Sequence, residues 1–172
     1  MSVNIKDWPG TALSSRHLDA GRVLTVRHKP RAEYAWDAGM AIGHYLHELK
    51  AGRLVARSCG SCRRVMIPPR MLCEECFRPT DGWVPVKDTG TVNTFSVCYV
   101  RWDVMRLKDP LLPAVIHIDG ASPGMGILHL LGEVDPGEVH IGMRVRAVWK
   151  DPAEREGAIT DIRYWKPLGR AK

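Results

Sequence analysis

Long apolar runs are absent from this chain of 172 residues. A helix that spans a bilayer needs about 20 consecutive, mainly apolar residues, and no stretch of the sequence comes near that length. The first ten residues, MSVNIKDWPG, also lack the apolar core and the small-residue cleavage site of a secretory signal. We therefore expect a cytoplasmic protein with no membrane segment.

The sequence also lacks the patterns that carry most enzyme chemistry. It has no glycine-rich phosphate loop, no serine elbow, no paired carboxylates at a useful spacing and no His/Glu metal motif. His117, His129 and His140 are scattered along the chain, and each is better explained as a structural or exposed side chain. These absences argue against a self-sufficient active site.

Cysteine is scarce, and four of the five cysteines stand in two pairs. Cys59 and Cys62 form one Cys-x-x-Cys, Cys73 and Cys76 form another, and ten residues separate the pairs. Each pair can form a tight knuckle, and two facing knuckles give the tetrahedral sulfur geometry of a structural zinc site. A mononuclear iron site has the same ligands, so zinc is favoured but iron stays open. Four thiolates leave no open position for catalysis at the metal.

The fifth cysteine, Cys98, lies within an alternating, β-prone run from Thr91 to Trp102. A nucleophilic cysteine needs a nearby base that generates the thiolate, and nothing in the sequence identifies one. We interpret Cys98 as a residue of a strand core, with a nucleophilic role as the alternative.

The first third of the chain predicts an arm and a helix. Residues 1–36 are weakly patterned and predict an extended arm. Large aromatic side chains are costly to leave exposed, so we expect Tyr34 and Trp36 to anchor on a partner or on the following helix. Residues 37–52 predict that helix, with an apolar stripe that includes Tyr45.

The rest of the chain predicts two β modules. Residues 53–82 predict a zinc ribbon, for which a metal supplies folding energy and which we expect Phe77 and Trp83 to cover. Residues 83–168 contain about five strand signals, which predict a small closed barrel of OB type, with a sandwich as the alternative. Residues 169–172 form a tail. The fold class is mainly β with an N-terminal helix, a rubredoxin-like zinc ribbon and a five-stranded OB-fold barrel.

Positive charge is concentrated before the barrel. Residues 1–82 contain 13 Lys and Arg against 8 Asp and Glu, whereas residues 83–172 contain 12 against 11. A zinc ribbon beside an OB barrel is typical of nucleic-acid binders. Such barrels bind single strands with basic grooves and stacking aromatics, and here the barrel half is close to neutral with few, scattered aromatics. A single-stranded nucleic-acid binder is therefore the alternative and not the expected function.

Five stretches in a fixed order carry a family resemblance. They are YLHELKAGRL (residues 45–54), RSCGSCRRVMIPPR (57–70), CEEC (73–76), WVPVKDTGTV (83–92) and IGMRV (141–145). With them, residues 37–168 resemble the zinc-ribbon/OB-fold proteins associated with acyl-CoA enzymes, a family formerly known as a domain of unknown function. Some members have lost the cysteines, and this chain keeps all four.

The resemblance implies a non-catalytic subunit. Proteins of this family are similar to the small partners of thiolases, of archaeal hydroxymethylglutaryl-CoA synthase assemblies, and of aldolases or hydratases in side-chain degradation. The large partner supplies the Cys/His chemistry, and the small subunit stabilises the assembly and helps to form the CoA or acyl-CoA site. A structural Zn²⁺, a thiolase-like catalytic partner and a CoA thioester at the interface are thus implied. The long arm is similar to that of thiolase partners of the benzylsuccinyl-CoA type.

Candidate contacts to CoA or to the partner follow from this resemblance and from the position of basic and aromatic residues. Ribbon arginines could meet CoA phosphates or acidic partner residues, with plain surface charge as the alternative. The candidate CoA- or partner-binding residues are Arg63, Arg64, Arg70, Tyr34, Trp36 and Tyr45.

Overall fold

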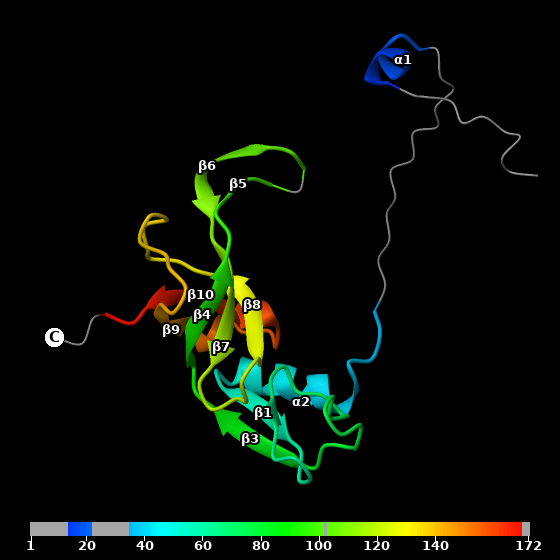
Figure 1. Cartoon of the computed structure of the whole chain (residues 1–172), viewed down its shortest axis with the longest axis vertical. Helices are drawn as coiled ribbons and strands as arrows, with labels where there is room; N and C mark the ends of the chain where they lie inside the picture. Colours follow the sequence, from blue (N-terminus) through cyan, green and yellow to red (C-terminus); the bar gives the residue numbers. More distant parts are fainter. Residues whose placement is uncertain (1–13, 22–34, 102, 170–172) are drawn as a thin grey trace, which may run out of the picture. The chain divides into compact units, whose positions relative to one another are not determined.

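The computed structural model describes residues 14–21, 35–101 and 103–169, and it divides into two units, Met1–Trp36 and Asp37–Lys172 (Figure 1). The described part of the first unit contains one short helix, α1 (Ser15–Asp19). None of the described helices is long and apolar enough to cross a membrane. Helix, ribbon and barrel all belong to the second unit.

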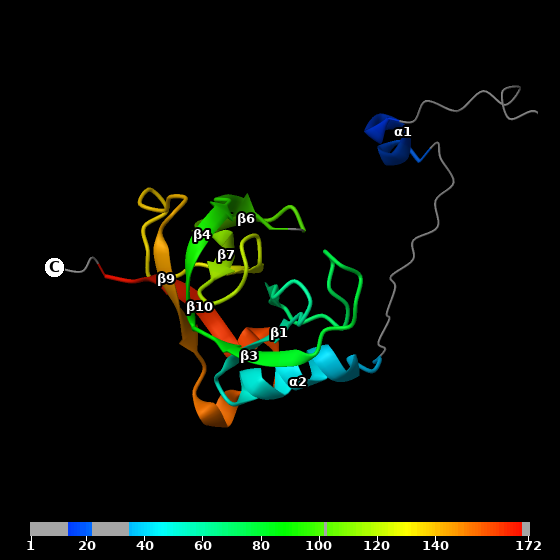
Figure 2. The ribbon, with the colours of Figure 1, turned by 60° about the horizontal axis from the view of Figure 1, so that its bottom comes forward.

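Helix α2 (Gly39–Lys50) lies along strand β1 (Leu54–Ser58) of the ribbon (Figure 2). Its buried residues are spaced four apart, so they form one stripe along the helix; they are Ala41, Tyr45 and Leu49. Gly52 follows the helix with φ +74°, a left-handed conformation that glycine adopts without strain and that turns the chain into β1.

The ribbon is a three-stranded antiparallel sheet in the order β2–β1–β3, with β2 at Val65–Met66 and β3 at Gly82–Val86. Strand β1 pairs with β3 along its whole length but with β2 over two residues only. Trp83 of β3 is packed between the His44 ring, with centroids 4.3 Å apart, and the Arg57 guanidinium, 4.5 Å from the ring centroid. These contacts tie α2 to the ribbon sheet.

The barrel contains five strands in the hydrogen-bonded order β10–β9–β4–β7–β8. Their bounds are β4 Thr89–Phe95, β7 Pro113–Ile118, β8 Gly126–Leu130, β9 Arg144–Trp149 and β10 Ile162–Pro167. A parallel bridge between Leu131 and Trp165, with the Gly132 N–H donating to the Trp165 carbonyl at 2.9 Å, joins the two ends of the sheet. The predicted five-stranded OB barrel is therefore confirmed.

Ribbon and barrel share one buried core. Leu54 and Met66 of the ribbon belong to the same cluster as Ile116 and Trp165 of the barrel. The loop between β7 and β8 adds polar contacts, because the Val65 N–H donates to the Ser122 hydroxyl at 2.8 Å and the Ser122 N–H donates to the Val65 carbonyl at 2.9 Å. The two modules therefore form one packed body.

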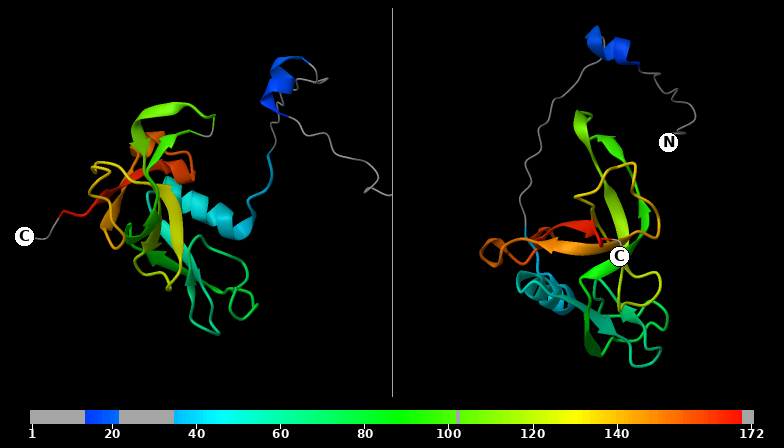
Figure 3. Two further views of the ribbon diagram at one scale, coloured as in Figure 1. Left: turned by 45° about the horizontal axis from the view of Figure 1, so that its top comes forward. Right: turned by 90° about the vertical axis from the view of Figure 1, so that its left-hand side faces the viewer.

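A two-stranded hairpin of β5 (Cys98–Val100) and β6 (Arg106–Leu111) is inserted between β4 and β7 and extends beyond the barrel (Figures 1 and 3). The sequence predicts one long strand through Trp102 and a loop over residues 103–112. The second prediction is wrong, because residues 106–111 are strand, and the long strand is interrupted after Phe95. Trp102 itself lies outside the described residues.

Candidate metal centre

The four paired cysteines meet at the end of the ribbon. Their sulfur atoms all lie within 4.8 Å of one another, and the shortest separations are 3.4 Å for Cys59–Cys76 and 3.5 Å for Cys62–Cys73. A tetrahedron of sulfurs at the usual zinc–sulfur distance has edges of about 3.8 Å. The set therefore fits a tetrahedral metal ion, and it is the one cluster of this kind within residues 14–21, 35–101 and 103–169.

The two knuckles have the same backbone. In the first, the Arg63 N–H donates to the Cys59 carbonyl at 2.7 Å, and in the second, the Phe77 N–H donates to the Cys73 carbonyl at 2.9 Å. Both residues have positive φ, +62° for Arg63 and +52° for Phe77. In the first knuckle, backbone N–H groups also donate to the sulfurs, those of Ser61 and Cys62 to Cys59 and that of Arg64 to Cys62. This knuckle is therefore arranged for thiolates before a metal arrives.

The protonation of the thiols follows from these contacts. The backbone N–H of Cys62, with the Cys76 thiol next in effect, lowers the pKa of Cys59 to about 7. The pKa of Cys76 is raised to about 12, chiefly by its hydrogen bond with Cys59. Cys59 therefore ionises readily, whereas ionisation of Cys76 beside it is unfavourable. A divalent cation relieves this repulsion by displacing the remaining protons, which makes binding depend on pH.

Two of the three candidate arginines are already engaged next to the metal centre. Arg64 Nε lies 2.6 Å from Glu74 Oε1, and Arg70 Nη1 lies 3.5 Å from Glu74 Oε2. Arg64 also reaches Glu75 at 3.7 Å. Arg63 makes no ion pair with a described residue. The sequence-predicted role of these arginines in ligand or partner binding stays a prediction, but Arg64 and Arg70 have a structural use that the spacing does not reveal.

The aromatic candidates are dispersed. Tyr45 is only 3% exposed, so it is a core residue of α2 and not part of a docking surface of the folded chain. Tyr34 lies outside the described residues, and Trp36, at the end of the first unit, is 77% exposed. Phe77 does not cover the ribbon as the sequence predicts, because its side chain is 84% exposed.

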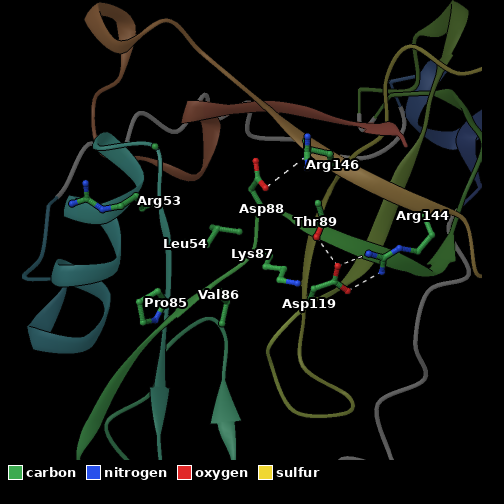
Figure 4. Close-up of a pocket in the computed structure, with 11 residues that line it drawn as sticks. Arg53, Leu54, Pro85, Val86, Lys87, Asp88, Thr89, Asp119, Arg144 and Arg146 are labelled. Carbon is green, nitrogen blue, oxygen red and sulfur yellow. Dashed lines mark hydrogen bonds and ion pairs between the residues drawn. The ribbon is translucent and has the colours of Figure 1, made fainter. Parts of the chain in front are cut away.

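A pocket of about 620 Å³ opens where the ribbon meets the barrel (Figure 4). Its lining is rich in cations, namely Arg53, Lys87, Arg144 and Arg146, with Asp88 and Asp119 as the acidic members. Sequence reasoning did not single out this site, although Arg144 and Arg146 alternate on β9 and so point to one side.

Asp119 is the centre of the polar network in this pocket. Arg144 forms a bidentate ion pair with it, and the Thr89 hydroxyl donates to Asp119 Oδ2 at 2.5 Å. The Arg144 guanidinium holds the pKa of Asp119 down at about 2, with burial opposing and Thr89 assisting. Figure 4 shows Lys87, from the connection between β3 and β4, and Arg144, from β9, approaching Asp119. The pocket is thus a preorganised, mainly cationic surface.

Neither Cys98 nor the metal centre is arranged for catalysis. Cys98 is half-buried at the start of β5, opposite Leu111, and its sulfur has no hydrogen bond to a described residue. The metal centre has four protein ligands available and no evident open position. The geometry therefore provides a structural metal site and a cationic pocket.

Family models match most of the second unit. Residues 47–81 match the rubredoxin-like zinc ribbon domain of ChsH2, and residues 83–150 match the C-terminal OB-fold domain of ChsH2. A DUF35 domain-containing scaffold protein of Methanocaldococcus jannaschii is 28% identical over 132 residues, which cover 75% of this chain and 92% of that protein.

Two solved structures share the fold. A protein of unknown function from the DUF35 family of Sulfolobus solfataricus superposes with a TM-score of 0.57 at 21% identity, covering 73% of this chain and 83% of that chain. A chain of the Ltp2–ChsH2(DUF35) aldolase superposes with a TM-score of 0.55 at 21% identity, covering 78% and 98%.

The fold and the cysteine cluster define a zinc-ribbon/OB-fold protein. More narrowly, the chain belongs to the DUF35 family, of the type that ChsH2 represents.

Proposed function

We propose that this protein is a non-catalytic accessory subunit of a thiolase-type acyl-CoA acyltransferase, which it stabilises and whose CoA or acyl-CoA site it helps to shape. The M. jannaschii relative is named as a scaffold protein, and one structural neighbour comes from a complex with an aldolase. The choice of a thiolase-type partner rests on the motif resemblance. We place the protein in the cytoplasm, where cysteines stay reduced and available for zinc.

The observation that carries the proposal is the outward face of strands β7 and β8. Ala114 and Ile116 point into the core, so Pro113 and Val115 point outward, and their cross-strand partners are Leu130 and Leu128. An antiparallel sheet with one face in water normally alternates apolar and polar residues. Here most of the outer face is apolar as well, with His117 as its polar residue, and Leu128 is 68% exposed. Such a face is typical of a surface that a partner protein covers.

The same face weakens the nucleic-acid alternative. OB domains use this part of the barrel to bind oligonucleotides, and they do so with cations and stacking aromatics. This chain presents leucine, valine and proline there. Three of the four cations of β9 and β10 are engaged in ion pairs, Arg144 with Asp119, Arg146 with Asp88 and Lys166 with Glu133. The fourth, Arg163, is exposed and makes no ion pair with a described residue.

For the CoA part of the proposal, the cationic pocket fits phosphates better than the ribbon arginines do. Lys87 makes no ion pair with any residue that the structure describes, and the pocket is large enough for a phosphate-bearing group. Arg64 and Arg70 would first have to leave Glu74. Arg144 and Arg146 of the pocket are also paired, with Asp119 and Asp88. We therefore place a CoA phosphate at Lys87, beside the interface with the catalytic subunit.

Co-expression tests the assembly. The chain is produced with a candidate thiolase-type enzyme from the same organism, and size-exclusion chromatography with light scattering measures the mass of the eluting species. We expect one hetero-oligomeric peak that contains both chains. Separate elution of the two proteins with zinc bound would count heavily against the proposal, and a salt-dependent affinity for single-stranded DNA in a filter-binding titration would favour the alternative.

Calorimetry on the purified complex tests the CoA site. We expect Lys87→Ala to weaken CoA binding by about tenfold, which corresponds to one lost charge-assisted contact of about 1.4 kcal/mol. Arg64→Ala and Arg70→Ala are the matched changes at the ribbon, and we expect CoA affinity to stay within about twofold. Loss of CoA affinity in Arg64→Ala or Arg70→Ala, with none in Lys87→Ala, would instead place the phosphate site on the ribbon.

A further inference from the structure

We infer that the β5–β6 hairpin is the element with which this chain docks on its partner protein, and that Val104 at its tip enters an apolar pocket with an acidic rim. The inference rests on the proposed function and deepens it, because it names the docking element and the chemistry of the surface that receives it.

The conformation and exposure of Val104 are the first evidence for this inference. Its backbone has φ +66°, and its side chain is 81% exposed. The turn is closed by the Val104 N–H, which donates to the Arg101 carbonyl at 3.0 Å, and by the Arg101 N–H, which donates to the Met105 carbonyl at 2.9 Å. Glycine or asparagine suits such a position, whereas a β-branched residue there is a rare outlier. Neither the backbone conformation nor burial within this chain explains a valine at this position. We therefore attribute it to a contact with another molecule.

The surface around Val104 is apolar over a wide area. On the hairpin, Tyr99, Val100, Met105 and Leu111 are exposed as well. Only Leu112 separates Leu111 from β7, so the hairpin leads onto the outward face that carries Leu128 and Leu130. Together with Val104, the hairpin and β8 therefore carry seven exposed apolar side chains. Large exposed apolar patches on soluble proteins mark interaction sites.

Charge decides what kind of partner fits. Arg101 is paired with Asp103 next to the tip. On β6, Arg106 and Lys108 are exposed and make no ion pair with a described residue, while Asp109 is the one acidic residue of that strand. A second copy of the chain would bring these cations against each other. An apolar pocket with acidic residues at its rim complements both features of the hairpin.

The ribbon offers a matched control for the tip of the hairpin. Phe77 is likewise apolar, has φ +52° and is 84% exposed. It belongs to the second knuckle of the ribbon, and the ribbon lies at the opposite end of the second unit from the hairpin (Figures 1 and 3). Replacing either residue with glycine removes an exposed apolar side chain and relieves an unfavourable backbone conformation, so the two changes are chemically alike and differ only in place.

The experiment measures affinity for the purified thiolase-type enzyme by biolayer interferometry, together with the melting temperature of each full-length variant. We expect Val104→Gly to melt no lower than the unaltered chain and to bind at least tenfold more weakly. Phe77→Gly should also melt no lower, and its affinity should stay within twofold. Reversal of both cations in Arg106→Glu with Lys108→Glu should slow association at low salt, with the difference narrowing in 0.5 M salt.

The outcomes separate the two proposals. Failure of the unaltered chain to bind overturns the proposed function and the partner with it. Binding that survives Val104→Gly, or that is lost in Phe77→Gly instead, overturns the hairpin alone. Binding of the unaltered chain to phosphatidylcholine–phosphatidylglycerol vesicles that Val104→Gly abolishes, with affinity for the enzyme unchanged, overturns the protein partner in favour of a lipid surface.

Discussion

The zinc ribbon and the barrel reach a folded state by different physical means. The ribbon has one full-length strand pair, a β2 strand of two residues and two knuckles with left-handed backbone. Little of its fold can be stabilised by hydrogen-bonded strands, so the metal supplies what burial does not. The barrel has five strands closed by the Leu131–Trp165 bridge around a filled core. The stability of the ribbon is therefore a property of its metal, and that of the barrel a property of its packing.

The junction complicates this contrast. The ribbon contributes Leu54 and Met66 to the common core, and the Val65–Ser122 hydrogen bonds join the modules at the surface. If the barrel is stable without the metal, removal of the metal should unfold the ribbon and leave the barrel folded. Four changes break or sharpen the comparison, beginning with the one of largest expected effect.

Loss of a metal ligand should unfold the ribbon alone. Structural zinc contributes about 10–16 kcal/mol of apparent binding free energy in zinc-finger peptides at pH 7, far more than a ribbon of this size can replace. We expect Cys73→Ser to lose the metal and to lose amide protection in β1–β3, while β4, β7 and β9 stay protected. Hydrogen exchange and elemental analysis measure both. Cys98→Ser is the control and should keep one metal ion per chain; stable metal binding by Cys73→Ser would contradict the assignment.

Truncation of the closing residue should affect the barrel instead. Trp165 is 0% exposed, and removal of a large buried aromatic side chain destabilises a protein by about 3–5 kcal/mol. We expect Trp165→Ala to lower the free energy of unfolding in urea by that amount, with the metal retained until the barrel unfolds. Leu128→Ala on the exposed face should change it by less than about 0.5 kcal/mol. Equal effects of the two changes would contradict the assignment of core and surface.

Acid should weaken the barrel at the pocket through Asp119, because its carboxylate binds Thr89 of β4 and Arg144 of β9. Its folded pKa, about 2, lies below the ordinary value of 3.8. Its contribution is therefore present above about pH 4 and is lost as the pH falls through about 2. We expect this contribution to the free energy of unfolding to be only about 1 kcal/mol, because the paired Arg144 is nearly half exposed and solvent screens the ion pair.

Urea midpoints at pH 5, 3 and 2 measure this effect. Between pH 5 and 2 the free energy of unfolding of the unaltered chain should fall by about 1 kcal/mol more than that of Asp119→Asn. Acid also releases the metal, but this affects both proteins alike and cancels in the comparison. Parallel pH profiles of the two proteins would exclude a stabilising role for the carboxylate.

The smallest change concerns the first knuckle. Arg63 has φ +62°, which costs an L-residue about 1–2 kcal/mol. Glycine relieves that strain but loses part of the gain to the entropy of the unfolded chain. We expect Arg63→Gly to stabilise the metal-bound protein by about 0.5–1 kcal/mol, measured as the melting temperature with excess zinc. Arg63→Ala keeps the strain and should give no gain; a more stable alanine variant would show that the knuckle geometry is different.

The sequence was sufficient for the metal centre and the barrel because both leave short-range patterns. Two Cys-x-x-Cys pairs must converge if each forms a knuckle, and strands buried on one face, such as β7, alternate visibly. Strand β6 leaves no such pattern. Its residues, RLKDPL, are mostly exposed and include Pro110, so no buried face imposes a period of two. Proline is tolerated in this two-stranded hairpin because an edge strand leaves N–H groups unpaired.

The candidate contact residues were harder to assign because their surroundings come from distant parts of the chain. The partner of Arg64 is Glu74, ten residues away across the two knuckles. The pocket joins Lys87, Asp119 and Arg144, which three different segments contribute. Tyr45 belongs to the predicted apolar stripe of the helix and was also a candidate contact residue; it is buried, and α2 packs against β1. Long-range packing decides these cases, and no local period encodes it.

The parallel bridge at Trp165 also has a consequence during synthesis. Because β10 both pairs with β9 and closes the sheet against Leu131, the barrel cannot be completed until residues 162–167 have left the ribosome. Until then, the last residues of β8 and the open side of β9 are unpaired edges, which can pair with other chains. A nascent chain stalled before Ile162 should therefore bind chaperones that recognise exposed strand edges, whereas its ribbon, whose four cysteines are complete by residue 76, can already hold a metal.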